Sequence, residues 1–404
     1  MKLIVHNDDL TINTYSLEKN NFYNKELENH LGYISSDKKA LNALKIIEAY
    51  YSNSKVILFD HTNKIIENKL KALNIPEYKT SFNEKTIFDK KDFSMIFFTS
   101  GSTGEPVGAL KTKEHLENEI KISSKLLEKY KIKRVIVTVP FIHIYGTLMG
   151  IIYPLYNNID IVLKQHFLPN DLLNLIEENS LIITTPLYIK ALNKISSQKD
   201  LRTSVFISST GPLDAQNAKE FSQKFNTNVI QIFGSTETGG IAYKYNDEEL
   251  WTPFESVEIS TNKDNELKIQ SSFVSKTIFE KEFKDINSQL QTFDYIELID
   301  NKFKLIGRSS QILKIAGKRY STIQIEQLLE EHKDISKALV FVCNKDSSLK
   351  DESLDITIES KKEFSTKEIK EYLKHNLSNL KFSIKLKVVD KIPTSSVGKK
   401  LKII

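Results

Sequence analysis

The segment FFTSGSTGEPVG, from Phe97 to Gly108, is rich in residues suited to phosphate binding. Its last ten residues include two Ser, two Thr and three Gly. Such a loop, lying after a strand and before a helix, offers unobstructed backbone N–H groups and hydroxyls to phosphate oxygens. The G-x-x-x-x-G-K-[ST] pattern of the common nucleoside-triphosphate loop is absent, and Val107 stands where a cation would be welcome. Taken alone, the segment is equally interpreted as a flexible Ser/Gly turn.

A second stretch with chemical potential is FGSTETGG, residues 233–240. Thr236 offers a hydroxyl to a phosphate, and Glu237 offers a carboxylate to Mg²⁺, which prefers hard oxygen ligands. A Thr-Glu pair of this kind also occurs as a plain helix cap.

Two basic segments follow near the C-terminus. In GRSSQILKIAGKRYSTIQIEQLL, residues 307–329, Arg308 follows a glycine, and Lys314 and Gly317 come shortly after it. In KIPTSSVGKK, residues 391–400, a polar stretch between a Pro and a Gly presents Lys399. The alternative for such a terminal lysine is simple solvation.

The elements that position these residues alternate along the chain. Amphipathic stretches at 112–130 and 171–178 have apolar residues three or four apart, which indicates helices. Short apolar runs indicate buried strands at 54–60, 134–140, 180–186, 203–210 and 228–234. This alternation predicts an α/β fold with mainly parallel strands, in which ligands bind beyond the carboxyl ends of the strands. The ends at 99–108, 208–213 and 233–237 are therefore the candidates.

The sequence pattern changes after Trp251, where the alternation of strands and helices ends. Runs at 266–275, 290–300 and 302–310 predict short antiparallel strands. A smaller α+β unit follows, with helices near 322–332 and 366–378 and strands near 337–343 and 383–390. We therefore predict an N-terminal domain over 1–307 and a C-terminal domain over 308–404, joined by a hinge at Arg308–Ser310.

Composition excludes several classes of function. The net charge of +5 arises from 57 basic and 52 acidic residues spread along 404 residues, without the footprint of a nucleic-acid-binding protein. A single cysteine, Cys343, excludes an internal disulfide and fits a buried strand. We expect no secretory signal and no membrane span, which together indicate a cytoplasmic protein.

Taken together and in this order, the four segments resemble the adenylate-forming superfamily, on its acyl- and aryl-CoA synthetase or acyl-AMP ligase branch. FFTSGSTGEPVG is similar to that family's phosphate loop, FGSTETGG to its Tyr-Gly-x-Thr-Glu segment, and IPTSSVGKK to its final Pro-x-x-x-x-Gly-Lys element. The segment TFDYIELIDNKFKLIGRSSQILKIAGKRYSTIQIE is similar to its Thr-Gly-Asp and Gly-Arg hinge region. Weaker matches are VPFIHIYG, 139–146, and SSTGPL, 208–213. The resemblance covers roughly residues 95–404, and the region before it is short for this family.

The resemblance implies a fold and a reaction. The fold is a large domain of helix-flanked, mainly parallel sheets with a small β-rich subdomain, followed by a small mobile α+β domain. The reaction joins a carboxylic acid to AMP, using ATP and Mg²⁺ and releasing pyrophosphate. The acyl group then passes to a thiol, either of CoA or of a carrier protein's phosphopantetheine.

Site residues follow from the resemblance. It assigns the phosphates to Thr99, Ser100, Gly101, Ser102, Thr103 and Gly104. It assigns the rest of the nucleotide to Thr210, Gly211, Pro212, Phe233, Gly234, Ser235, Asp294 and Arg308. Thr236 would contact the α-phosphate, Glu237 would bind Mg²⁺, and Lys399 would bond the acyl carboxylate and α-phosphate. Lys314 and Gly317 would serve the thioester step after rotation of the small domain.

The acyl pocket is implied at His143, Tyr145, Gly146 and Ser208, with packing as the alternative to a proton-transfer role for His143. Phe141 and Tyr188 nearby favour an aromatic or medium-length acid. The stretch GTLMGIIYPLY lacks the acidic residue that amino-acid-activating members present, so an amino acid substrate is disfavoured.

Departures from the family pattern leave a second function open. Val107 replaces the loop lysine, so weaker ATP binding is expected unless Lys111 or Lys113 supplies the charge. Phe293 replaces a glycine, Ser310 a hinge Asp or Lys, and Ser209 and Thr210 a Gly-Gly pair. The alternative is a nucleotide- and acyl-binding module that keeps this fold with weakened catalysis; an unrelated kinase-like phosphate loop is a third and remote reading.

Overall fold

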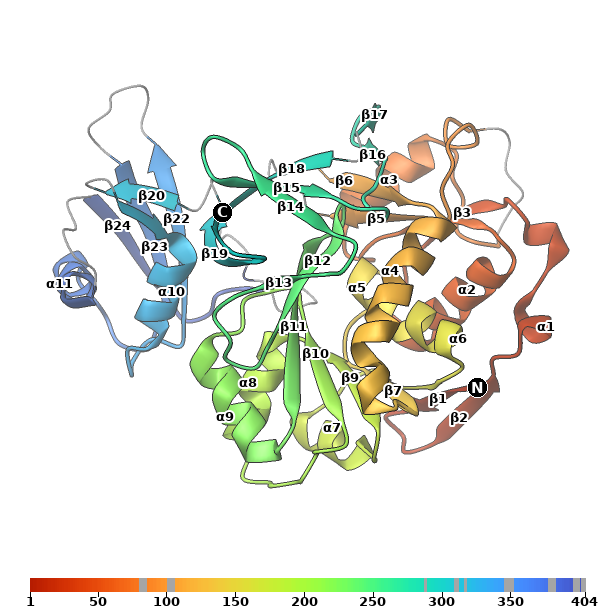
Figure 1. Cartoon of the computed structure of the whole chain (residues 1–404), viewed down its shortest axis with the longest axis horizontal. Coiled ribbons are helices and arrows are strands. Elements are labelled where there is room, and N and C mark those ends of the chain that lie inside the picture. The colour runs from red at the N-terminus through yellow and green to blue at the C-terminus, as the bar shows by residue number, and fades with distance from the viewer. Residues whose placement is uncertain are drawn as a thin grey trace. The chain divides into compact units, whose positions relative to one another are not determined.

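The computed structural model describes residues 1–79, 86–99, 106–286, 289–308, 312–315, 318–344, 352–376, 383–394 and 400. The chain forms two compact units (Figure 1). Unit 1 comprises Met1–Glu258 with Ile269–Leu290, and unit 2 comprises Ile259–Lys268 with Gln291–Ile404. The predicted division into 1–307 and 308–404, with a hinge at Arg308–Ser310, stays a prediction.

A nine-stranded sheet forms the centre of unit 1, in the order β13-β12-β11-β10-β9-β7-β8-β1-β2. The six strands from β11 to β1 in this order run parallel. The strands β12 and β13 at one edge, and β2 at the other, are antiparallel to their neighbours. The bounds are β1 (Lys2–His6), β2 (Ile12–Ser16), β7 (Arg134–Val137), β8 (Asp160–Lys164), β9 (Ser180–Thr184), β10 (Val205–Ser208), β11 (Asn228–Ser235), β12 (Gly239–Tyr245) and β13 (Thr252–Pro253).

A second sheet of unit 1 has six strands in the order β17-β16-β6-β5-β4-β3. Its parallel part is β3 (Leu31–Ile34), β4 (Lys55–Leu58) and β5 (Met95–Thr99). Strand β6 (Val107–Lys111) is antiparallel to β5, and β16 (Thr277–Phe279) and β17 (Phe283–Asp285) complete the sheet.

Helices cover both sheets because each apolar strand run must be buried on two faces. One buried cluster joins residues of both sheets to α2 (Lys39–Tyr51) and α4 (Lys113–Leu127). A second cluster packs α7 (Pro169–Leu175), α8 (Pro186–Lys194) and α9 (Ala215–Phe225) on the nine-stranded sheet (Figure 1). A third packs α3 (Lys64–Ala72) on the six-stranded sheet. The short helices are α1 (Lys19–Phe22), α5 (Ile144–Thr147) and α6 (Tyr153–Asn157).

Two further sheets and a hairpin follow along the chain. A four-stranded sheet has the order β14-β15-β18-β19, with bounds β14 (Glu258–Thr261), β15 (Glu266–Gln270), β18 (Gln289–Ile299) and β19 (Lys302–Arg308). Strands β20 (Ile312–Ile315) and β21 (Lys318–Ser321) form the hairpin. A three-stranded sheet of β22 (Lys337–Asn344), β23 (Glu352–Glu359) and β24 (Ser383–Val389) packs with α10 (Thr322–Glu330) and α11 (Thr366–Asn376).

The predicted strands and helices are confirmed, but the surroundings of the phosphate-loop segment were predicted wrongly. The loop joins β5 to the antiparallel β6 and does not lead directly into a helix. The chain continues as a strand because Gly108, Ala109 and Leu110 are buried against the sheet. Helix α4 begins only after Thr112, whose hydroxyl accepts from the backbone N–H of His115 and caps it. Within the described residues, no helix combines the length and the hydrophobicity needed to cross a bilayer.

Lys39, at the start of α2, buries its ammonium group against the ends of two parallel strands. Its Nζ donates to the carbonyl oxygens of Val137 (3.2 Å), Thr138 (3.0 Å) and Lys164 (3.4 Å). The side chain is only 8% exposed, and no carboxylate of the described residues forms an ion pair with it. Burial lowers the pKa of Lys39 to about 7.

We predict that Lys39 makes the stability of the protein rise with pH above neutrality. Between the native pKa of about 7 and the ordinary value of 10.5, the unfolded chain binds the extra proton. The unfolding free energy of wild type, minus that of Lys39→Met, should therefore increase by about 1 kcal/mol per pH unit from pH 7 to 9. Urea denaturation measures this difference. The exposed neighbour provides the control, Lys38→Met, which should show no such slope; a flat difference for Lys39→Met would refute the prediction.

Thr210, just after β10, has a left-handed backbone with φ of +75°. A β-branched residue is strained there, at a cost of about 1–3 kcal/mol, whereas glycine is not. Thr210→Gly should therefore raise the free energy of unfolding by about 1 kcal/mol in denaturant titrations. Ser209→Gly is the matched control, because Ser209 lacks a positive φ and donates its hydroxyl to the Ile232 carbonyl at 3.0 Å. Equal effects of the two substitutions would show that strain at Thr210 is not the cause.

Candidate functional site

A tight turn between β11 and β12 carries Thr236 and Glu237. The Ser235 backbone N–H donates to the Thr238 hydroxyl at 2.9 Å, and the Thr238 N–H donates to the Ser235 hydroxyl at 3.2 Å. A β-carbon on Gly234 would lie 2.2 Å from the Gly239 carbonyl oxygen, and Gly239 has φ of +71°. Glycine is therefore required on both sides of the turn, which explains the spacing of FGSTETGG.

The side chain of Glu237 is suited to a metal ion. It is half-buried, and within the described residues no hydrogen bond or ion pair involves its carboxylate. No group of three or more metal-ligating side chains occurs in that same part of the chain. The donor set therefore fits Mg²⁺ held by one carboxylate and by phosphate oxygens of a nucleotide, because Mg²⁺ keeps several ligands from outside the protein.

The predicted adenine-binding residues lie at the same edge of the sheet. Strands β10 and β11 are parallel and pair Ser208 with Gln231, so the segment after Ser208 begins beside the last residues of β11, which include Phe233. The register between β11 and β12 shifts after Phe233, and the Phe233 ring lies 5.6 Å from that of Trp251 at 51°. The structure thus brings the two predicted strand ends together.

The segment assigned to the acyl pocket crosses these strand ends. The Tyr145 hydroxyl donates to the carbonyl oxygens of Thr184 (3.1 Å) and Ile207 (2.7 Å), and burial raises its pKa. A β-carbon on Gly146 would lie 2.1 Å from the Pro140 carbonyl oxygen. These contacts hold the start of α5 against β9 and β10. The buried Ser208 hydroxyl has no hydrogen-bond partner within the described residues.

His143 precedes α5 at its N-cap position, and its backbone carbonyl accepts from Thr147. Burial lowers the pKa of His143, although the Asp60 carboxylate opposes the shift. The ring is therefore neutral at pH 7, which suits a pocket wall or a proton acceptor better than a proton donor. The hydroxyl of Tyr188 donates to the Phe167 carbonyl at 3.1 Å, and Phe141 is fully buried in the core.

The phosphate-loop prediction is described only at its edges. Thr99 pairs with Val107 where the two strands part, and its hydroxyl donates to the Val107 carbonyl at 3.4 Å. Ser100, Gly101, Ser102, Thr103 and Gly104 lie outside the described residues. Two lysines considered as substitutes for the missing cation are engaged elsewhere. The Lys113 ammonium donates to Asn53 Oδ1 at 2.9 Å, and that of Lys111 to the Phe273 carbonyl at 2.7 Å.

Unit 2 carries the residues predicted to bind ribose. Asp294 and Arg308 face each other across β18 and β19, and Arg308 Nε donates to Asp294 Oδ1 at 3.1 Å. Asp294 is buried and Arg308 half-exposed. Gly307 has φ of +147°, beside a break in the strand register. Phe293 is 64% exposed, because alternate residues of a strand face opposite sides and Asp294 takes the buried side.

The remaining predictions lie beside or outside the described residues. Lys314 pairs with Arg319 in the β20–β21 hairpin. Gly317, Ser310 and Lys399 are outside the described residues.

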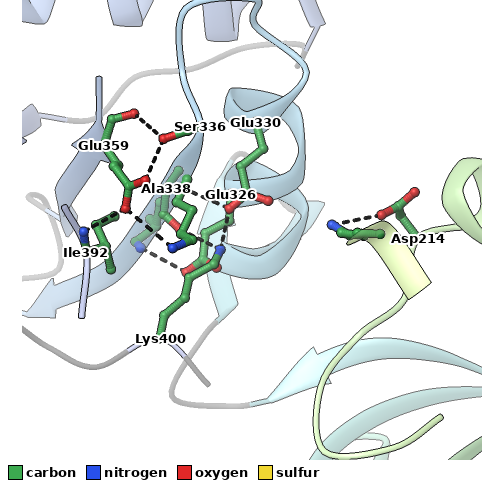
Figure 2. Close-up of polar contacts among 11 residues, drawn as sticks. Asp214, Glu326, Glu330, Ser336, Ala338, Glu359, Ile392 and Lys400 are labelled. Carbon is green, nitrogen blue, oxygen red and sulfur yellow. Dashed lines mark hydrogen bonds and ion pairs between the residues drawn. The ribbon is translucent and has the colours of Figure 1, made fainter. Parts of the chain in front are cut away.

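Lys400, which directly follows Lys399, forms ion pairs with two glutamates of α10 (Figure 2). Its Nζ contacts Glu326 Oε2 (2.8 Å), Glu330 Oε1 (2.5 Å) and the Ala338 carbonyl oxygen (2.6 Å). Burial acts to lower the pKa of Lys400, but the two carboxylates outweigh it and raise the value. Lys400 also forms a β-bridge with Thr394, and the Ile392 N–H donates to Glu359 at 2.7 Å (Figure 2). Both ends of the segment that carries Lys399 are thus attached to unit 2.

Sequence reasoning missed the structural roles of Lys39, Lys111 and Lys400. Each is a lysine beside an apolar or polar run, and nothing in such a pattern separates it from a solvated surface lysine. The pairing of Lys400 with Glu326 and Glu330 has one detectable signal, which is the i, i+4 spacing of the two acids on a predicted helix.

Comparison with known proteins agrees with this geometry. Residues 30–271 match the family model described as AMP-binding enzyme. A relative from Staphylococcus haemolyticus, named "Putative long chain fatty acid-CoA ligase VraA", is 26% identical over 357 residues, which cover 83% of this chain and 75% of the relative.

Solved structures of similar fold include O-succinylbenzoate CoA synthetase from Bacillus subtilis. Its complex with the acyl-adenylate intermediate has a TM-score of 0.80 at 18% identity, covering 98% of this chain and 94% of that one. Its complex with ATP and magnesium has a TM-score of 0.78 at 18% identity, covering 98% and 95%. The chain therefore belongs to the AMP-binding enzyme family, and its relatives include enzymes named as CoA ligases.

Proposed function

We propose that this enzyme uses ATP to activate a carboxylic acid as its acyl-adenylate, releases pyrophosphate, and then transfers the acyl group to a thiol. The observation that carries the proposal is the Thr236–Glu237 turn. It lies beside Phe233 and the Ser208–Pro212 strand end, and the Glu237 carboxylate forms no hydrogen bond or ion pair with a described residue. A bound Mg²⁺ would supply positive charge to the phosphates.

Different residues of the chain are proposed to serve different roles in forming the acyl-adenylate. In the first step a carboxylate must attack an anionic α-phosphorus, so positioning and positive charge carry the catalysis. Thr236 is proposed to bond the α-phosphate and Glu237 to hold the metal. Asp294, kept in place by Arg308, is proposed to accept hydrogen bonds from the ribose hydroxyls. Lys399 is proposed to bond the acyl carboxylate and the α-phosphate.

An aryl or fatty acid is the proposed substrate. Phe141, Ile142 and Leu148 are buried around the start of α5, and the Tyr145 hydroxyl is already bonded to two carbonyl groups. This environment favours an apolar acyl group over a charged one. The name of one relative points the same way, to a long-chain fatty acid, whereas O-succinylbenzoate, in the name of a similar structure, is an aryl acid that carries a second carboxylate. CoA is the proposed acceptor, with carrier-protein phosphopantetheine as the second choice.

The defining experiment is carboxylate-dependent exchange of labelled pyrophosphate into ATP. Wild type should support exchange with at least one acid from an aryl and fatty acid panel, and Lys399→Ala should lower it by about 100-fold or more. Lys391→Ala, an exposed lysine of the same segment, is the control and should keep wild-type exchange. ATP binding without exchange for any acid would favour the catalytically weakened binding module.

The proposed rotation of the C-terminal part is tested by the second half-reaction. Lys399→Ala should transfer the acyl group from a supplied acyl-adenylate to CoA at close to the wild-type rate, because Lys399 serves the first step only. Equal losses in both half-reactions would argue against separate conformations.

Val107 gives a prediction about ATP affinity. Val107→Lys places a cation at the mouth of the β5–β6 hairpin, where neither Lys111 nor Lys113 supplies one. We expect ATP to bind about 3- to 10-fold more tightly, measured by calorimetry, with a steeper dependence on salt. Val107→Met is the uncharged control. Unchanged affinity in the lysine variant would mean that the loop does not hold the phosphates as proposed.

A further inference from the structure

Lys111 is buried beneath the turn that carries Glu237. It is the last residue of β6 and is only 1% exposed. Its Nζ donates to the carbonyl oxygen of Glu237 at 3.1 Å and to that of Phe273 at 2.7 Å. The Glu237 carbonyl also accepts from the Ser275 N–H at 2.8 Å. The backbone of the proposed metal ligand is thus held by two donors from outside its own turn.

Glu119 holds the other side of the same turn. From α4, its Oε1 accepts from the Gly240 backbone N–H at 2.7 Å. Its Oε2 lies 2.5 Å from the place that a β-carbon on Gly239 would occupy. The chain therefore bends around the Glu119 carboxylate, and glycine at 239 is required by this approach as well as by its φ.

The charges of this network balance. Burial lowers the pKa of Lys111 to about 8, while Glu119 and Glu237 oppose the shift, so the group remains mostly protonated at pH 7. Burial raises the pKa of Glu119, and Lys111 opposes it. Each group thus offsets part of the cost of burying the other.

We propose that Lys111 is a positioning residue for Glu237, which fixes the metal-binding carboxylate from beneath and ties it to the hairpin that carries the phosphate loop. The proposal rests on the proposed function and deepens it. Lys111 and the loop share the short strand β6, whereas Glu237 belongs to the turn of the other sheet of unit 1. One side chain thereby links the strand that follows the phosphate-loop segment to the turn that carries Glu237. Lys111, considered above as a substitute for the Val107 cation, donates to backbone carbonyl groups instead.

The test compares Lys111→Met with the neighbouring control Lys113→Met, whose ammonium donates to Asn53 and does not touch the turn. The first readout needs no ligand: hydrogen exchange of the peptide covering residues 233–242. Lys111→Met should speed exchange of the turn amides by about tenfold or more, and Lys113→Met should leave it unchanged. Unchanged exchange in Lys111→Met would overturn the proposal.

The second readout is the Mg²⁺ dependence of pyrophosphate exchange at saturating ATP and acid. Residues that orient a metal ligand typically account for about 10- to 100-fold in metal affinity. Lys111→Met should raise the Mg²⁺ concentration for half-maximal exchange by about tenfold, with the KM for the acid unchanged. A fall in kcat alone, without a shift in Mg²⁺ dependence, would contradict positioning and indicate a general loss of structure.

A second variant covers the case in which Lys111→Met does not fold. Lys111→Met with Glu119→Gln removes the buried charges together, which is far less costly than leaving one unpaired. The Glu237 carbonyl still loses its lysine donor, so both readouts should shift as for the single variant. If wild type shows no pyrophosphate exchange, the proposed function fails, and hydrogen exchange alone decides whether Lys111 holds the turn.

Discussion

The parallel pairing of β10 with β11 is the constraint on which the candidate site depends. It aligns Ser208 with Gln231, so the segments that follow both strands leave the sheet at one edge. The next strand, β12, is antiparallel, so the chain must reverse directly after β11. That reversal is too tight for side chains at 234 and 239, and it presents Thr236 and Glu237 beyond the sheet. The change from parallel to antiparallel pairing thus creates the proposed metal site.

Three lysines that are buried or half-buried donate hydrogen bonds to backbone carbonyl oxygens. Lys39 satisfies three carbonyl oxygens without a carboxylate, and burial lowers its pKa to about 7. Lys111 has carboxylates nearby and is less depressed, to about 8. Lys400 contacts two carboxylates directly, and its pKa is raised. The series shows how partner charges offset the desolvation of an ammonium group.

The described residues that are proposed for the site are supported by partners within their own unit. The Thr236–Glu237 turn depends on Lys111 and Glu119 of unit 1, while Asp294 and Arg308 pair within unit 2. Ile392 and Lys400 are likewise held within unit 2, by Glu359 and Glu326. A proposed rotation of the C-terminal part between two half-reactions requires such internal support, because contacts that change during rotation cannot hold a residue in both states.

The sequence by itself determined the α/β class, the main strands and helices, and the motifs that place this chain in its family. These depend on local periodicity and on glycine and hydroxyl spacing, which a single segment carries. Only the tertiary structure decided that the phosphate-loop segment joins two strands, that Thr210 is strained, and that Lys111 lies under Glu237. Those features depend on contacts between residues that are far apart in the sequence, or on the pairing of a neighbouring strand. A local sequence pattern carries no information about such contacts.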